Sequence, residues 1–532
     1  MLEYPHAPNH TRPPNSAGAA GGLRPGRGPG SAARDAHATA ANIRGGQPRH
    51  PCPATLPTTP ASPTVTPSPA TLPTPPASPA VDEPRYDLAM RPQFAGDITA
   101  RAGLPRYRLR MRISPDEGTL AGAERIALPN RTGAPLGDVA LRLYPNFPRG
   151  ALGRGGDVRM QLSAASVDGR PVEIAYAAQR TAALLPLVPP LPPGAVATIE
   201  VTFTATIRAW EDGSWPLPSY YPMLAVRDGD GWRLDVTRFA DRVFAESALY
   251  DAEIDVPANL TVAASGSTIA SATRDGRTTF QVVSGPAREF ALTVGDFEVE
   301  RAAAGEVAVN VYTARGSTLE AREIARVAAG ALADFERRFG DYPYRELDIH
   351  LLVGDYDGGD EYPGLILLFS NGPIDDGTRY VAAHEVAHQW WYGVVGNDIY
   401  REPWLDEAFA QYSGILYKQD SAGPSAAAAD WEREVARRYQ AALGDGDLPV
   451  GLAIDDYPSF NVYYRTVYGK GALFLRTLRE QLGDEAFFRG LQSYYAEHRY
   501  GVATAADVRR ALEQSSGQDL AALFQGWVGG GR

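Results

Sequence analysis

The pattern of apolar and polar positions changes twice along this chain of 532 residues. Between residues 85 and 303, short stretches such as RYRLRMRI and ATIEVTFTATI alternate apolar and polar side chains, and turn residues such as Asp168 and Gly169 separate them. Alternation with a period of two is typical of strands that bury one face. The pattern therefore predicts an all-β domain over residues 85–303.

From residue 304 onward the apolar spacing becomes helical. The segment TLEAREIARVAAGALADFERRFG (318–340) places Leu319, Ile324, Val327 and Phe335 on one broad face and ends at Gly340. Two predicted strands follow, LDIHLLV (347–353) and LILLFS (365–370), with a Gly/Asp loop between them and several helices after them. We predict an α+β domain with a helical C-terminal half over residues 304–532, and hence an α+β multidomain fold.

Residues 1–84 are rich in Pro, Ala, Gly and Thr and hold few large apolar side chains, which predicts a disordered tail and linker. Within them PATLPTTPASPTV (53–65) recurs as PATLPTPPASPAV (69–81), a repeat that favours a stiff polyproline spacer. Such spacers often separate an extracytoplasmic enzyme from a surface anchor. The first thirty residues nevertheless lack the apolar core of a signal peptide, and no lipidation signal precedes Cys52. A cell-surface and a cytoplasmic location both stay open.

Composition narrows the classes of partner and of metal site. The chain is 44% hydrophobic and 21% charged, as expected of a globular protein, and no apolar run is long enough for a membrane span. The formal net charge of -12 argues against nucleic-acid binding, which needs clustered Lys and Arg. The single cysteine excludes an intramolecular disulfide and a cysteine-built zinc site. Any metal must be held by His, Asp or Glu.

The segment HEVAH (384–388) is the first candidate for such a site. On a helix, His384 and His388 lie four residues apart on one face and can present both imidazoles to a single ion. Glu385 lies about a third of a turn from His384, close enough to reach a water on the metal as a general base. His-Glu-x-x-His arises by chance in roughly one such chain in a hundred. The motif supplies two ligands and a base, so a third ligand has to come from elsewhere.

The third ligand is expected downstream. The metzincin continuation would need Gly and His where the chain has Trp391 and Val394, so that alternative fails. The segment REPWLDEAFAQYSGILY (401–417) is predicted to form an amphipathic helix that starts at Pro403. Glu407 lies on it among the apolar residues Leu405, Phe409, Tyr412 and Leu416. A carboxylate buried there would need a partner or a metal, and the alternative is an ordinary surface glutamate.

His-Glu-x-x-His followed by the glutamate of WLDEAFA resembles the gluzincin zinc metallopeptidases of the aminopeptidase N family, in which W-L-N-E-G-F-A carries the third zinc ligand. The resemblance implies one Zn²⁺ per chain, held by His384, His388 and Glu407. It covers residues 85–532 and implies a saddle-like β domain followed by a thermolysin-like catalytic domain. It also implies a short form of the family that lacks the C-terminal helical-repeat domain. Asp406 and Ala408 stand where the family usually has Asn and Gly.

Two further segments carry the resemblance. GDYDGGDEYPG (354–364) is similar to the family's exopeptidase motif, which implies that Glu361 binds the substrate's free α-amine, with Gly358 and Gly359 beside the peptide. Asp360 replaces the usual Met, and a solvated acidic turn is the alternative interpretation. VYGKGALFLRTLREQLG (467–483) resembles the family's Tyr-x-Lys-Gly helix.

The resemblance implies a role in catalysis for Tyr468, the tyrosine of that helix. The hydroxyl of Tyr468 would stabilise the oxyanion, because it can donate a hydrogen bond while neutral. Tyr463, shortly before it, is expected to line the substrate pocket. The family also supplies a second amine-binding residue, usually Gln or Glu, from its β domain. The nearest region, PSYYPMLAV (218–226), holds no acid or amide.

The sequence therefore predicts a zinc-dependent aminopeptidase that acts on peptides with a free N-terminus. A zinc endopeptidase with the same catalytic core is the alternative, because Asp360 is atypical and the second amine contact is unassigned. A non-catalytic binding module that contains zinc is a third hypothesis. Glu385 and Tyr468 argue against it, because a structural site would close the fourth zinc position with a protein ligand.

Overall fold

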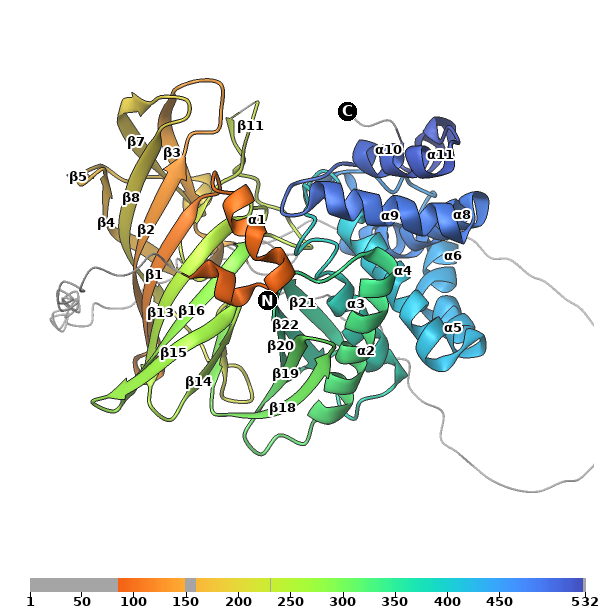
Figure 1. The fold of residues 1–532 in the computed structure, drawn as a ribbon, viewed down its shortest axis with the longest axis horizontal. Helices are drawn as coiled ribbons and strands as arrows, with labels where there is room; N and C mark the ends of the chain where they lie inside the picture. Colours follow the sequence, from red (N-terminus) through yellow and green to blue (C-terminus); the bar gives the residue numbers. More distant parts are fainter. Residues whose placement is uncertain (1–84, 149–158, 230, 530–532) are drawn as a thin grey trace, which may run out of the picture. The chain divides into compact units, whose positions relative to one another are not determined.

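The computed structural model describes residues 85–148, 159–229 and 231–529 (Figure 1). The predicted tail and linker lie outside these ranges. Within them a β-rich N-terminal region precedes an α+β region whose C-terminal half is helical, which confirms the predicted fold class and order. No helix of the described ranges has both the length and the apolarity needed to cross a membrane.

The β-rich region contains an eight-stranded and a four-stranded sheet that contribute to one apolar core. Burial alternates along its strands, because one face of each packs inward. The eight-stranded sheet has the order β15 (Ser267–Arg274), β16 (Arg277–Ala287), β13 (Ala248–Pro257), β1 (Arg106–Ser114), β2 (Thr119–Pro129), β8 (Val196–Thr206), β4 (Met160–Val167) and β5 (Arg170–Pro171). The four-stranded sheet has the order β10 (Met223–Leu224), β3 (Leu136–Arg142), β7 (Ala182–Leu191) and β6 (Ala175–Ala177).

Smaller elements complete this region. The short helix α1 (Ala95–Ala100) precedes β1. A three-stranded sheet contains β14 (Thr261–Ala264), β17 (Leu292–Gly295) and β9 (Trp215–Pro216), and a hairpin joins β11 (Arg227–Asp228) to β12 (Gly231–Trp232). Between β12 and β13 the chain runs without a helix or strand over residues 233–247. That irregular stretch contributes to the cavity described below.

The second region starts with a five-stranded sheet. Its order is β18 (Phe297–Ala304), β19 (Val307–Ala314), β20 (Glu346–Val353), β22 (Leu365–Ser370) and β21 (Gly358–Tyr362). The predicted boundary between residues 303 and 304 falls inside β18. The segment predicted as a Gly/Asp loop contains the strand β21, so that prediction is wrong over residues 358–362. Pairing with β22 outweighs the low strand propensity of Gly and Asp, and it leaves β21 at the edge of the sheet.

The helices of this region lie between β19 and β20 or after β22 in the sequence, and the first two of them pack on this sheet (Figure 1). They are α2 (Ala321–Phe339), α3 (Asp376–Ala387), α4 (Trp404–Ala422), α5 (Pro424–Trp431), α6 (Arg437–Gly444), α7 (Phe460–Tyr464), α8 (Gly471–Leu482), α9 (Asp484–His498), α10 (Ala505–Ser516) and α11 (Ala521–Trp527). The end of α2 at Gly340 and the start of α4 after Pro403 are as predicted. The amphipathic prediction for α4 is wrong, because every residue from Trp404 to Tyr417 is buried. Helices α2, α3, α5 and α8 all contact it.

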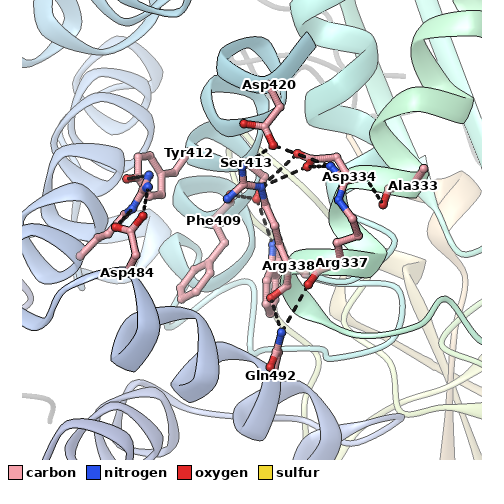
Figure 2. A network of polar contacts seen from close by, with 12 residues as sticks. Ala333, Asp334, Arg337, Arg338, Phe409, Tyr412, Ser413, Asp420, Asp484 and Gln492 are labelled. Carbon is pink, nitrogen blue, oxygen red and sulfur yellow. Dashed lines mark hydrogen bonds and ion pairs between the residues drawn. The ribbon is translucent and has the colours of Figure 1, made fainter. Parts of the chain in front are cut away.

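A network of polar contacts fixes α4 against α2 and α9 (Figure 2). Arg338 of α2 lies 3.1 Å from Asp334 on its own helix and 2.7 Å from Asp420 of α4. Gln492 of α9 donates a hydrogen bond to the carbonyl oxygen of Arg338 at 3.1 Å. The charges of this network are paired, so the helix that carries Glu407 has a fixed position relative to its neighbours.

Arg288 joins the two regions. It follows β16, and its buried guanidinium donates from Nε to the carbonyl oxygen of Tyr392 at 2.6 Å and from Nη2 to that of Val394 at 3.3 Å. Nη2 also donates to the carbonyl oxygen of Gly501. Glycine at position 396 makes room for this cation, because a Cβ there would overlap the Arg288 guanidinium. One cation thus satisfies carbonyl groups from separate segments of the helical region.

Replacing this cation should uncouple the two regions. Arg288→Met keeps an apolar side chain of similar reach and removes the donor to the buried carbonyl oxygens of Tyr392 and Ala245, each at a cost of about 1–3 kcal/mol. We expect the free energy of unfolding to fall by about 3 kcal/mol or more, measured from the urea midpoint. The control is Arg125→Met, whose side chain is 58% exposed and pairs with Glu200 at 3.0 Å. Its expected loss is under about 1 kcal/mol, and equal losses in the two variants would contradict the role of Arg288.

Candidate metal centre and substrate cavity

Helices α3 and α4 bring three predicted ligands together. The Nε2 atoms of His384 and His388 lie 3.1 Å apart. The Oε2 atom of Glu407 lies 3.3 Å from His384 Nε2 and 3.5 Å from His388 Nε2. All three side chains are buried, and their ligand atoms form a group that could hold a metal ion.

The spacing of these atoms fits a small tetrahedral ion. Zinc binds His nitrogen and carboxylate oxygen at about 2.0–2.1 Å, so ligand atoms around it should be roughly 3.3 Å apart. The separations of 3.1, 3.3 and 3.5 Å lie around this value. The donor set of two imidazoles and one carboxylate is one that zinc uses in sites with an open fourth position. The three residues therefore fit zinc in both chemistry and spacing.

Hydrogen bonding prepares His388 as a ligand. Its Nδ1 atom lies 3.0 Å from the carbonyl oxygen of Trp391, which can only accept a hydrogen bond. Nδ1 therefore carries the hydrogen, and the lone pair of the neutral ring lies on Nε2, which faces Glu407. Burial lowers the pKa of His388, but the hydrogen bond and charge of Glu407 outweigh it and raise the pKa to about 9. The same contacts with His384 and His388 overcome burial and hold the pKa of Glu407 well below its usual range.

Glu385 lies beside the three ligands. Its side chain is buried, and its Oε2 atom has no hydrogen-bond partner among the described residues. Burial raises its pKa to about 8, against the opposing charge of His388. Gly359 of β21 makes room for it, because a Cβ at that position would lie 2.7 Å from Oε1 of Glu385. The strand edge and the carboxylate therefore lie in close contact.

Tyr468 reaches the same point from a different helix. It lies on the π-helical turn η8 (Arg465–Lys470), and its hydroxyl donates a hydrogen bond to Oε1 of Glu407. Its ring stacks on that of His384 with centroids 5.9 Å apart. Close packing of α8 on α4 allows this approach, because a Cβ at Gly471 would lie 2.6 Å from the Cβ of Ala408. Tyr463, predicted to line the pocket, is buried with its ring centroid 6.1 Å from that of Tyr468.

Strand β21 positions Glu361 opposite the histidine helix. A carboxylate oxygen of Glu361, one of Glu385 and a ring nitrogen of His388 all lie within 4.8 Å of one another. Gln389, directly after His388, accepts from the backbone N–H of Gly364 at 2.8 Å and donates to the carbonyl oxygen of Tyr362 at 3.1 Å. Gln389 thus fixes the end of β21 relative to α3. Gly358, the first residue of the strand, packs against the ring of Tyr356.

Two acidic residues that sequence reasoning missed lie in the adjoining cavity. Asp241 belongs to the irregular segment 233–247, and Glu289 follows β16. Both line the cavity with Asp360 and Glu361. Burial, and then the charge of Asp241, raise the pKa of Glu361. In the sequence, only the charged and irregular character of its segment could have indicated Asp241 as a site residue. No sequence feature indicated Glu289.

The segment PSYYPMLAV, which holds no acid or amide, contributes indirectly. Ser219 and Tyr220 from it line the cavity. The hydroxyl of Ser219 donates to Oε2 of Glu289, and the hydroxyl of Tyr392 donates to Oε1. These two bonds oppose the effect of burial, which raises the pKa of Glu289 to about 7. The segment therefore orients a carboxylate that lies 70 residues further along the chain.

Comparison with known proteins places the histidine helix in a family. The peptidase family M1 domain model matches residues 327–527. Aminopeptidase 2 of Candida albicans is 28% identical over 254 residues, which cover 45% of this chain and 27% of that protein. Aminopeptidase N of Streptomyces lividans is 28% identical over 225 residues, which cover 40% and 26%. The match thus spans about a quarter of the length of these curated relatives.

Solved structures share the fold over a larger part of the chain. The M1 zinc metallopeptidase from Deinococcus radiodurans superposes with a TM-score of 0.60 at 23% identity, over 81% of this chain and 94% of that one. A mutant of the same enzyme bound to a Tyr-Ser-Ala substrate gives the same TM-score at 21% identity. The predicted family resemblance is confirmed, and the chain contains a peptidase family M1 domain.

Proposed function

We propose that the protein is a zinc-dependent aminopeptidase that hydrolyses N-terminal residues from peptides. The observation that carries the proposal is the convergence of two imidazoles and a carboxylate, spaced for one ion, beside a second carboxylate, that of Glu385, which is not part of the set. In this proposal His384, His388 and Glu407 hold one Zn²⁺. The names of the M1 relatives support the same activity.

The chain's own groups supply the proton transfers. When bound, zinc acts as a Lewis acid that lowers the pKa of water and polarises the scissile carbonyl. Glu385 takes a proton from the attacking water on its carboxylate and passes it to the leaving nitrogen as the C–N bond breaks.

Other groups orient the peptide and stabilise developing charge. The free edge of β21 can add an extended peptide as a further strand, with its amine towards Glu361. Glu361 and Asp241 bind the ammonium group, and a substrate blocked there loses both contacts. The hydroxyl of Tyr468 donates a hydrogen bond to the oxyanion of the tetrahedral intermediate. In the structure this one hydrogen is donated to Glu407, so the hydroxyl changes acceptor when the oxyanion forms.

Removing the proposed base tests the chemistry separately from metal binding. Glu385→Ala should retain one zinc per chain by elemental analysis, since Glu385 is outside the ligand set. Peptide hydrolysis should fall by about a thousandfold or more, because the proton transfer has no other carrier. Glu485→Ala is the control, since that side chain is 90% exposed on α9. Retained turnover in Glu385→Ala would contradict the assigned base, and lost zinc would contradict the ligand set.

The amine contacts distinguish an aminopeptidase from an endopeptidase. A peptide with a free amine and its N-acetylated form should differ in kcat/KM by about a hundredfold or more, because acetylation removes a charge-assisted contact and adds bulk at Glu361. Glu361→Gln should lower kcat/KM for the free amine and narrow the difference. The products are separated by chromatography. Similar rates for the two peptides would instead favour the endopeptidase alternative.

A further inference from the structure

The cavity beside Glu361 is lined by more carboxyl groups than one substrate amine can pair with. Its volume is about 130 Å³, and four carboxyl groups line it, from Asp241, Glu289, Asp360 and Glu361. Two arginines, Arg159 and Arg242, also line it. With every group ionised the formal charge of the lining is therefore two negative. One substrate ammonium group cancels half of that charge.

The proposed function leaves Asp360 and Glu289 unused, and of these two Asp360 has the oxygen without a donor. Its side chain is only 7% exposed, and its Oδ2 atom has no hydrogen-bond partner among the described residues. Tyr362 and the charge of Arg242 already interact with this carboxylate, so only Oδ2 lacks a donor. A buried carboxylate oxygen without a donor is unfavourable, so the site favours a ligand that donates a hydrogen bond to Oδ2. The neighbouring carboxylate of Glu289, in contrast, already accepts from two hydroxyl groups.

Strand geometry directs Asp360 and Glu361 to different parts of a bound residue. Successive side chains of a strand point to opposite faces. Gly359 and Glu361 share the face that meets Glu385, and Asp360 lies on the other face of β21 while still lining the cavity. A substrate whose amine meets Glu361 would therefore place its first side chain towards Asp360.

We propose that the cavity selects substrates whose first residue is arginine or lysine, and that Asp360 receives the cation of that side chain. The inference rests on the proposed aminopeptidase function. A guanidinium or ammonium group would pair with Oδ2 and cancel the remaining formal charge of the lining. The rings of Tyr144, Phe147 and Tyr220 form part of the same wall and suit the flat face and apolar stem of such a side chain.

The direct test compares arginine with citrulline, which has nearly the same shape and no charge. We expect kcat/KM for the arginine 4-nitroanilide to exceed that for the citrulline 4-nitroanilide by about thirtyfold or more. Asp360→Asn should reduce this ratio to about threefold or less, and Asp360→Glu should keep most of it. The matched control is Asp355→Asn, an exposed carboxylate in the loop before β21, which should leave the ratio unchanged.

A binding measurement separates this inference from the catalytic proposal. Calorimetry with the Glu385→Ala variant should show tighter binding of argininamide than of citrullinamide, with the preference lost in Glu385→Ala/Asp360→Asn. Hydrolysis of leucine or citrulline substrates without a preference for arginine would overturn the basic specificity and leave the aminopeptidase function standing. Absence of all hydrolysis, with the binding preference intact, would overturn the function and support the cavity. An unchanged ratio in Asp360→Asn would overturn the role of Asp360.

Discussion

Buried negative charge around two histidines is the constraint on which the rest of the structure depends. Glu385 follows His384, and Asp406 precedes the proposed ligand Glu407; all three carboxyl groups are buried. Asp360 and Glu289 are buried in the adjoining cavity. Carboxylates are expensive to bury unless cations or hydrogen-bond donors meet them. A divalent ion and a cationic ligand would stabilise these buried carboxylates. The fold already fixes the carboxylate positions without either of them.

The scaffold meets this demand through close packing and a few buried bonds. Gly471 against Ala408 lets Tyr468 reach Glu407, and Gly359 lets a sheet edge reach Glu385. Gln389 then fixes that edge to the helix that carries the histidines. These contacts join η8 and α8 to α4, and β21 to the histidine helix, and the partners in each pair are separate in sequence. The precision of the site thus comes from small residues and backbone bonds as much as from the charged groups themselves.

The sequence could predict features that depend on neighbouring residues, but not those that depend on contacts between distant segments. The spacing of His384 and His388 on a helix is a local pattern that periodicity can place, whereas the ligand role of Glu407 followed from the family resemblance. The strand β21 was missed because Gly and Asp favour turns, while its pairing with β22 is a tertiary effect. The complete burial of α4 depends on the helices around it. Asp241 and Glu289 join Glu361 only because the chain folds back on itself, so no spacing rule could find them.

The π-helical turn η8 sets the direction of Tyr468 independently of the helix that follows. A π-turn takes up one residue more than an α-helical turn, which rotates the side chains before it by about 100° relative to those after it. The apolar residues of α8 can therefore keep their phase towards the core while the tyrosine turns towards Glu407. The extra residue therefore changes the direction of the side chains around the helix axis. Aligned family members should consequently tolerate insertions and deletions elsewhere in the continuous helical run from α7 to α8 more readily than at this turn.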